Sequence, residues 1–155
     1  MTAVKTAEAW HALNEGATEL DVVVNVGKVL SEDWDYVTSD LRSIIEVAHQ
    51  KSALVKVIFE NSYLQDSHKE KLCQICGELR ADFVKTATGY GEYGALDDDL
   101  KLMRRCSPAH VRIKAAGGVR NFARLLEVRQ LGVSRVGATS AAKILDECKA
   151  YLGSS

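Results

Sequence analysis

The sequence lacks the features that mark fibrous, disordered, secreted or membrane-spanning chains. It has a single proline, and its eleven glycines follow no repeat, which excludes collagen-like and low-complexity chains. Its apolar runs are short, as at residues 22–24, so no segment is long enough to span a bilayer. The first residues contain no apolar stretch typical of a signal peptide, and the four cysteines are scattered. We therefore expect a cytoplasmic protein with reduced thiols.

The chain also lacks an excess of charge of either sign. Twenty basic and twenty-one acidic side chains give a formal net charge of −1, so neither a nucleic acid nor an anionic membrane is expected as a partner. Apolar residues make up 46% and charged residues 26% of the chain, which is typical of a globular protein and excludes disorder. With 155 residues and no long linker, residues 1–155 are expected to form a single domain.

Short β-branched runs alternate with longer amphipathic stretches along the chain. The expected strands are residues 20–26, 54–59, 82–86, 111–115 and 135–138. The expected helices are residues 6–14, 31–50, 66–79, 96–105, 121–131 and 141–152. This alternation predicts βα units and therefore an α/β fold with about five parallel strands.

The two faces of the expected strands differ in chemistry. One face is apolar throughout: Leu20, Val22, Val24, Val55, Val57, Phe59, Val84, Val111, Ile113 and Val136. The other face repeatedly carries polar groups: Asp21, Asn25, Lys56, Glu60, Lys85, Arg112, Lys114 and Thr139. Helices normally cover both faces of a parallel sheet, so a charged face favours an incomplete (β/α) barrel of the TIM type with helices only outside. An open sheet with a solvated charged face is the alternative.

Lys56, Lys85 and Lys114 are expected on the same inner face as Asp21 and Glu60. An ordinary lysine has a pKa of about 10.4, so only about one in two thousand is a free amine at pH 7. A neighbouring cation and desolvation both lower that pKa, and lowering it to about 7 requires about 4–5 kcal/mol. Salt bridges alone are the better interpretation of an average buried lysine, but three lysines on three strands favour a Schiff-base nucleophile beside a second cation.

Two glycine-bearing loops follow the fourth and fifth expected strands. One is Ala116–Arg120, and the other runs from Gly137 to Ala141 and opens a helix. Glycine allows close approach of the backbone, and free N–H groups at the start of a helix favour an anion. Adjacent in a barrel, the two loops together predict a site for a phosphorylated substrate. Taken singly, each loop is better explained by a turn or a helix cap.

The remaining motifs give weaker indications of function. Residues 89–94 match G-x-G-x-x-G, but the following strand offers cations where a dinucleotide site needs an acidic residue. Cys73 and Cys76 lie in a helical apolar stripe, so core packing explains them better than half of a zinc site. The four histidines show no paired ligand spacing. We expect neither a metal nor a cofactor.

Four segments resemble the deoxyribose-phosphate aldolase family in order and spacing. They are residues 19–23, 54–60, 82–89 and 113–120, which include Lys-Thr-Ala-Thr-Gly and Ala-Gly-Gly-Val-Arg. The resemblance implies a class I aldolase on a TIM barrel that cleaves 2-deoxyribose 5-phosphate into glyceraldehyde 3-phosphate and acetaldehyde without a metal.

The resemblance also implies residue roles. Lys85 matches the Schiff-base lysine, Lys114 the lysine that lowers its pKa, and Asp21 a carboxylate that moves protons through a water. The positions that match the phosphate site or line the pocket are Thr88, Gly89, Gly117, Gly118, Thr139 and Ser140.

The resemblance begins at the helix before the family's fourth strand, so the first three βα units have no counterpart. Five strands cannot close a barrel of the usual size, and open parallel edges favour association. A contracted barrel, an open sheet with covered edges and edge pairing between chains all remain possible. We favour a compact five-unit, barrel-like fold that forms a homo-oligomer through its strand edges. A catalytically silent relative that binds phosphate or partners is the alternative function, and a zinc-dependent protein ranks last.

Overall fold

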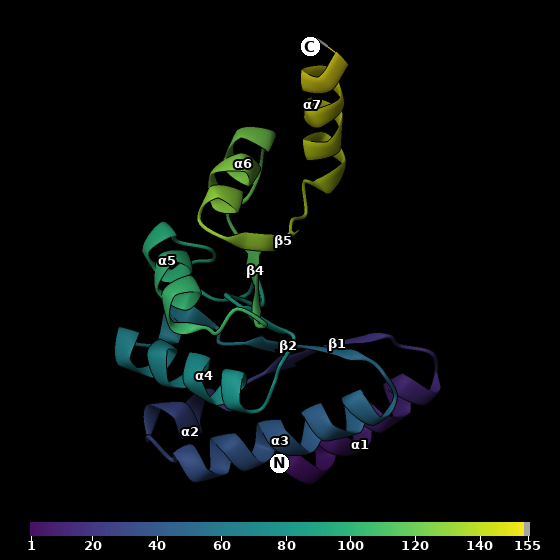
Figure 1. The fold of residues 1–155 in the computed structure, drawn as a ribbon, viewed down its shortest axis with the longest axis vertical. Coiled ribbons are helices and arrows are strands. Elements are labelled where there is room, and N and C mark those ends of the chain that lie inside the picture. Colours follow the sequence, from purple (N-terminus) through teal and green to yellow (C-terminus); the bar gives the residue numbers. More distant parts are fainter. Residues whose placement is uncertain (154–155) are drawn as a thin grey trace.

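The computed structural model describes residues 1–153, which form one parallel β-sheet with helices packed along it. The five strands lie in the sheet in their order along the chain, β1-β2-β3-β4-β5, and every neighbouring pair is parallel. The sheet curves and twists strongly, so that β4 and β5 turn away from β1 and β2, with α6 and α7 above them (Figure 1). This is the incomplete barrel of βα units that the alternating pattern predicted.

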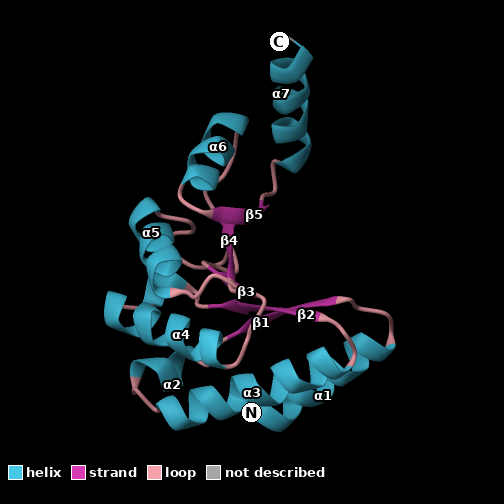
Figure 2. Ribbon diagram, in the orientation of Figure 1, coloured by secondary structure: helices cyan, strands magenta, loops and turns pink. Residues whose placement is uncertain are grey.

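The strands are β1 (Glu19–Val23), β2 (Leu54–Ile58), β3 (Phe83–Lys85), β4 (Arg112–Ala116) and β5 (Val133–Gly137). The helices are α1 (Thr2–Asn14), α2 (Val26–Leu30), α3 (Trp34–Gln50), α4 (Asp66–Glu78), α5 (Asp97–Cys106), α6 (Phe122–Gln130) and α7 (Ala141–Gly153), with a short 3-10 helix η1 (Asn61–Tyr63). Figure 2 shows how a loop and a helix follow each strand.

Predicted boundaries differ from the structure at several elements, most of all at residues 24–33, where the first strand already ends at Val23 and an unpredicted helix, α2, precedes α3. Asn25 was expected on the charged face of the first strand, but its side chain caps α2 by accepting a hydrogen bond from the Lys28 N–H at 3.2 Å. Asp33 then caps α3 in the same way, accepting from the Tyr36 N–H at 3.2 Å. Asn and Asp side chains favour this role because they satisfy N–H groups that a helix leaves free.

The hydrophobic core lies between the sheet and the helices. The apolar strand face predicted from alternation is buried: Val55, Val57, Phe59, Val84 and Ile113 have no exposed surface. Leu41, Ile44 and Ala48 of α3 join the same core, since α3 repeats its apolar residues at helical spacing.

The sheet is open. Strand β5 pairs with β4, β1 pairs with β2, and no ladder joins β5 to β1 within residues 1–153. A contracted, closed five-stranded barrel is therefore not what forms. A local irregularity between Ile113 and Lys114 shifts the register of β4 against β5, so that Lys114 pairs with Arg135. Within residues 1–153, no helix combines the length and the apolarity that crossing a membrane requires.

Candidate active site

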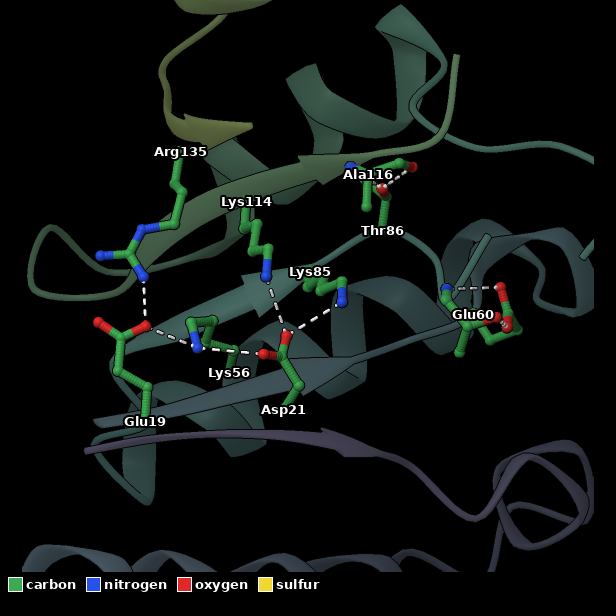
Figure 3. Close-up of polar contacts among 10 residues, drawn as sticks. Glu19, Asp21, Lys56, Glu60, Lys85, Thr86, Lys114, Ala116 and Arg135 are labelled. Atoms are coloured by element: carbon green, nitrogen blue, oxygen red, sulfur yellow. Dashed lines mark hydrogen bonds and ion pairs between the residues drawn. The ribbon is translucent and has the colours of Figure 1, made fainter. Parts of the chain in front are cut away.

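Lys85 and Lys114 meet at a single carboxylate on the inner face of the sheet (Figure 3). The Lys85 Nζ donates to Asp21 Oδ1 at 3.0 Å, and the Lys114 Nζ donates to the same oxygen at 3.1 Å. Register explains the meeting, because Lys85 pairs directly with Lys114 across β3 and β4. The side chains of the two lysines are 12% and 14% exposed, so both are largely but not completely buried.

A third lysine extends the cluster toward the start of the strands. Lys56, which pairs in register with Asp21, donates to Asp21 Oδ2 at 3.1 Å and lies 2.7 Å from Glu19 Oε2. Glu19 also accepts a hydrogen bond from Arg135, so an ion pair joins β1 to β5 across the inner face. Glu19 and Arg135 were not among the predicted site residues. Glu19 lies two residues before Asp21 and Arg135 two residues before Gly137, so the alternation of side chains puts both on the charged face.

The cluster holds four cations and two carboxylates, and this excess of positive charge acts on its titratable groups. Partial burial opposes ionisation of Asp21, but hydrogen bonds from Lys85, Lys114 and Lys56 outweigh it and lower the pKa of Asp21 to about 2. Hydrogen bonds from Arg135 and Lys56 likewise lower the pKa of Glu19 to about 2. Both carboxylates are thus ionised at neutral pH.

Burial and the neighbouring lysines both act on the titration of Lys114. Burial lowers its pKa from the ordinary value of 10.5, and the charges of Lys85 and Lys56 act in the same direction. Asp21 opposes these effects through its hydrogen bond and its charge. The nucleophilic role expected from the sequence belongs to Lys85, the other member of the pair, and that role stays a prediction.

Glu60 does not join the lysines, contrary to its expected place on the charged face. Its backbone is left-handed, with φ of 45°, so the side chain turns toward the loop after β3. There the carboxylate accepts a hydrogen bond from the Thr88 N–H at 3.2 Å and another from the Thr88 hydroxyl. Strand β2 ends at Ile58, and the alternation that predicted an inner-face position ends with it.

A pocket of about 360 Å³ opens beside the two lysines. The predicted site residues that line it are Lys85, Thr88, Gly89, Lys114, Gly117, Gly118 and Thr139. Ser140 is not in its lining and instead supplies the carbonyl that accepts the Ile144 N–H at the start of α7. Gly117 and Gly118 both have φ of +84°, a conformation that glycine adopts without strain. Exposed backbone and a nearby cation suit an anion such as phosphate.

A second cavity of about 370 Å³ adjoins the first. It is lined by the glycine-rich loop at residues 89–96 and shares Gly89, Gly117, Gly118 and Arg120 with the lysine pocket. Gly94 and Gly117 lie so close that a Cβ on Gly94 would come within 2.5 Å of the Gly117 backbone. Arg120 was not among the predicted site residues, and its charge directly after the glycine pair was the available signal.

Two cysteines expected in the core are found there. Cys73 and Cys76 have no exposed surface, and burial raises the pKa of the Cys73 thiol to about 12 and that of Cys76 further above its ordinary value. Thiols with raised pKa values are poor ligands and nucleophiles. Within residues 1–153, no group of three or more His, Cys, Asp or Glu side chains has the arrangement of a metal site.

Comparisons with known proteins agree on one family. The family model described as DeoC/LacD family aldolase matches residues 1–147. The chain is 55% identical over 152 residues to a deoxyribose-phosphate aldolase of Rhodopirellula baltica and 43% identical over 145 residues to one of Thermococcus kodakarensis. These alignments cover 98% and 94% of this chain but only 63% and 65% of the relatives.

Solved structures give the same result at the level of the fold. A structure named "QR15, an Aldolase" has a TM-score of 0.91 and 35% identity, and the match covers 98% of this chain and 68% of that one. A tetrameric deoxyribose phosphate aldolase of Aeropyrum pernix has a TM-score of 0.87 and 31% identity, covering 97% of this chain and 63% of that one. The chain thus spans about two thirds of the length of the proteins that it matches.

Proposed function

This chain belongs to the DeoC/LacD family of aldolases, and from that premise we propose that it is a class I aldolase acting on 2-deoxyribose 5-phosphate. The observation that carries the proposal is the pair of amines on Asp21 Oδ1 beside a glycine-lined pocket. This arrangement supports the proposal because a nucleophile, a second cation and a carboxylate would all be needed near one reacting carbonyl. The names of the curated relatives support the choice of sugar.

In the cleavage direction, the free amine of Lys85 adds to the C1 aldehyde and expels water, which forms an iminium. Removal of the proton from the C3 hydroxyl then breaks the C2–C3 bond, releases glyceraldehyde 3-phosphate and leaves an enamine on Lys85. Protonation at C2 and hydrolysis by water release acetaldehyde and restore the amine. The iminium acts as the electron sink, so the step needs no metal or redox group.

The neighbouring groups suit the remaining roles. Asp21, which is ionised at neutral pH, can accept and return protons through a water, and the second cation at Lys114 favours the neutral form of the amine beside it. Gly117, Gly118 and Thr139 are proposed to hold the phosphate, with Arg120 at the border of the pocket supplying positive charge. Thr88 and Gly89 line the same pocket. Ser140 stays a proposed phosphate ligand through its resemblance alone.

Borohydride reduction in the presence of acetaldehyde tests the proposal. The expected result is a reduced N-ethyl adduct on Lys85, located by peptide mass spectrometry, with no adduct in Lys85→Ala. Lys71→Ala is the matched control, because Lys71 lies on α4 and contacts Gln74 rather than the cluster. The absence of an adduct in the wild type, or an adduct that persists in Lys85→Ala, would remove this function.

A second candidate is a chain that binds phosphate or partners without turnover. One observation favours it: the Asp21 side chain is 37% exposed, so water reaches the cluster and weakens the effect of one charge on another. Binding of a sugar phosphate without imine trapping or cleavage would support this alternative. A cytoplasmic location and self-association through the strand edges also stay proposals, the latter supported by the tetrameric relative of Aeropyrum pernix.

A further inference from the structure

Thr86, which follows Lys85 directly, is fully buried and has no assigned role. Strand β3 ends at Lys85, while β4 continues for two residues beyond Lys114 to Ala116. The backbone groups of Ala116 therefore extend past the end of the neighbouring strand. Buried N–H and C=O groups need partners, and the Thr86 side chain supplies them.

The Thr86 hydroxyl bridges both backbone groups of Ala116. It donates to the Ala116 carbonyl at 2.9 Å and accepts from the Ala116 N–H at 3.0 Å (Figure 3). The Thr86 N–H donates to the Lys114 carbonyl at 3.2 Å, and its carbonyl accepts from the Asn61 N–H at 2.9 Å. One residue thus joins the end of β3 to β4 and to η1 immediately beyond the lysine pair.

The position of this bridge relates it to both halves of the site. Ala116 lies between Lys114 and the Gly117–Gly118 pair, so any displacement of Ala116 moves the second lysine and the glycine loop together. The two amines share one oxygen of Asp21 only while β3 and β4 keep their relative position. A valine of the same shape would remove the hydroxyl and leave two buried backbone groups without this partner.

From this geometry we propose that Thr86 is a positioning residue, whose hydroxyl holds Lys114 and the glycine loop in the arrangement that imine formation and phosphate binding require. The proposal rests on the proposed aldolase function and deepens it. Thr86 itself lies outside the lining of the lysine pocket, so it acts through Ala116 rather than on the substrate.

The test compares three variants. Thr86→Val and Thr86→Ala lack the hydroxyl, whereas Thr86→Ser keeps it. The readouts are the rate of borohydride trapping with acetaldehyde, its pH profile, and KM against kcat for 2-deoxyribose 5-phosphate. We expect Thr86→Val and Thr86→Ala to trap between about tenfold and about a hundredfold more slowly and to raise KM, since small displacements at a reacting centre have effects of this size. Thr86→Ser should stay close to the wild type.

Val37→Ala on α3 is the control for a loss of stability, because Val37 is 1% exposed and distant in sequence from the site. A Val37→Ala protein that is destabilised to the same extent in urea should keep the wild-type trapping rate and pH profile. If Val37→Ala loses trapping to the same degree, or if Thr86→Val and Thr86→Ala trap as the wild type does, the positioning role is wrong.

An NMR titration of the lysine side chains gives a readout that needs no turnover. The charged groups that face Lys114 are Asp21 from β1, Lys56 from β2 and Lys85 from β3. On β5, Arg135 is the residue opposite Lys114 in the strand register. In Thr86→Val the pKa of Lys114 should return toward its ordinary value, while in Thr86→Ser it should remain lowered. An unchanged Lys114 titration in Thr86→Val would overturn the proposal. A wild type that forms no adduct would instead remove the proposed function, and this titration would still test the bridge.

Discussion

At the scale of single residues, the proposed chemistry depends on which amines each oxygen of Asp21 contacts. Asp21 Oδ1 accepts from Lys85 and Lys114, while Oδ2 accepts from Lys56. The two amines of the pocket therefore share one oxygen, while Lys56 contacts the other oxygen and Glu19. Like charges held this close favour loss of a proton from one of them, which is the requirement for a nucleophilic amine at neutral pH.

Asp21→Asn tests the contribution of this carboxylate to folding. The pKa of Asp21 is about 2 in the folded chain and 3.8 ordinarily, so its stabilisation is fully present above about pH 4 and is lost as the pH falls toward 2. We expect Asp21→Asn to be less stable than the wild type at pH 7, and the difference should shrink below pH 4. Urea unfolding at a series of pH values measures it, and a difference that does not change with pH would contradict the expectation.

Replacement of Lys114 by Met separates charge from shape. The variant removes the second cation beside Lys85, so the adduct on Lys85 should form only at higher pH than in the wild type. The pH profile of borohydride trapping checks this. Lys101→Met, on the exposed side of α5, should leave the profile unchanged, and a Lys114→Met profile that matches it would show that the neighbouring charge is not needed.

At the scale of elements, the loops after the strands decide the shape of the pocket. The loop after β3 is held at its start by Glu60, and the Tyr93 hydroxyl donates to the Asn61 carbonyl further along. The β4 loop meets it where Gly94 contacts Gly117, and the Ala95 N–H donates to the Gly117 carbonyl at 3.0 Å. The proposed phosphate pocket therefore needs two loops that fit each other without side chains between them.

Glu60→Gln tests the support of the β3 loop. A glutamine keeps the size but presents one amide group where a carboxylate accepts from the N–H and the hydroxyl of Thr88, so the loss should be about 1–3 kcal/mol. We expect lower stability in urea and faster hydrogen exchange at residues 88–94. Glu78→Gln, on the exposed end of α4, is the matched control. Equal exchange in the two variants would argue against the role of Glu60.

Gly94→Ala tests the contact between the two loops. A Cβ at this position would meet Gly117 backbone atoms at 2.5 Å, and backbone cannot move aside as a side chain can. The substitution should cost about 1–3 kcal/mol and weaken binding of the phosphorylated sugar. Gly153→Ala, at the end of α7, is the comparison, because a Cβ there has nothing within 4 Å. Isothermal titration calorimetry with inorganic phosphate should show a larger loss of affinity in Gly94→Ala than in the comparison variant.

At the scale of the whole molecule, the open sheet leaves two parallel edges, at β1 and β5. On the β1 side, Lys5 of α1 covers part of the edge by donating to the Val23 carbonyl at 2.9 Å and pairing with the buried Asp40 at 2.7 Å. A groove of about 420 Å³ remains between α1 and β1. On the other side, α7 exposes Leu145 and Leu152, which are 60% and 66% accessible. Such surfaces favour association.

We therefore expect the chain to self-associate. Size-exclusion chromatography with light scattering should give a mass above that of one chain and rising with protein concentration. Leu145→Lys together with Leu152→Lys should lower that mass if α7 contributes to the interface, while the inner-face cluster stays intact. A strictly monomeric species at every concentration would contradict the expectation.

Much of the site could be predicted from local pattern. Side chains alternate between the two faces of a strand, so the spacing of Asp21, Lys56, Lys85 and Lys114 was enough to place them on one face, where they meet. The same rule would have found Glu19 and Arg135 had it been extended by two residues. It failed for Asn25 and Glu60, because alternation holds only within a strand and both lie beyond its end.

What the sequence determined by itself was therefore the order of the βα units, the face of each strand that carries charge, and the family. Tertiary structure alone decided that three lysines converge on one carboxylate, that the sheet stays open, and that Thr86 bridges to Ala116. The reason is physical: alternation and helix capping are set by neighbours along the chain, whereas distances between strands depend on register and on sheet curvature. Those depend on packing across the whole sheet.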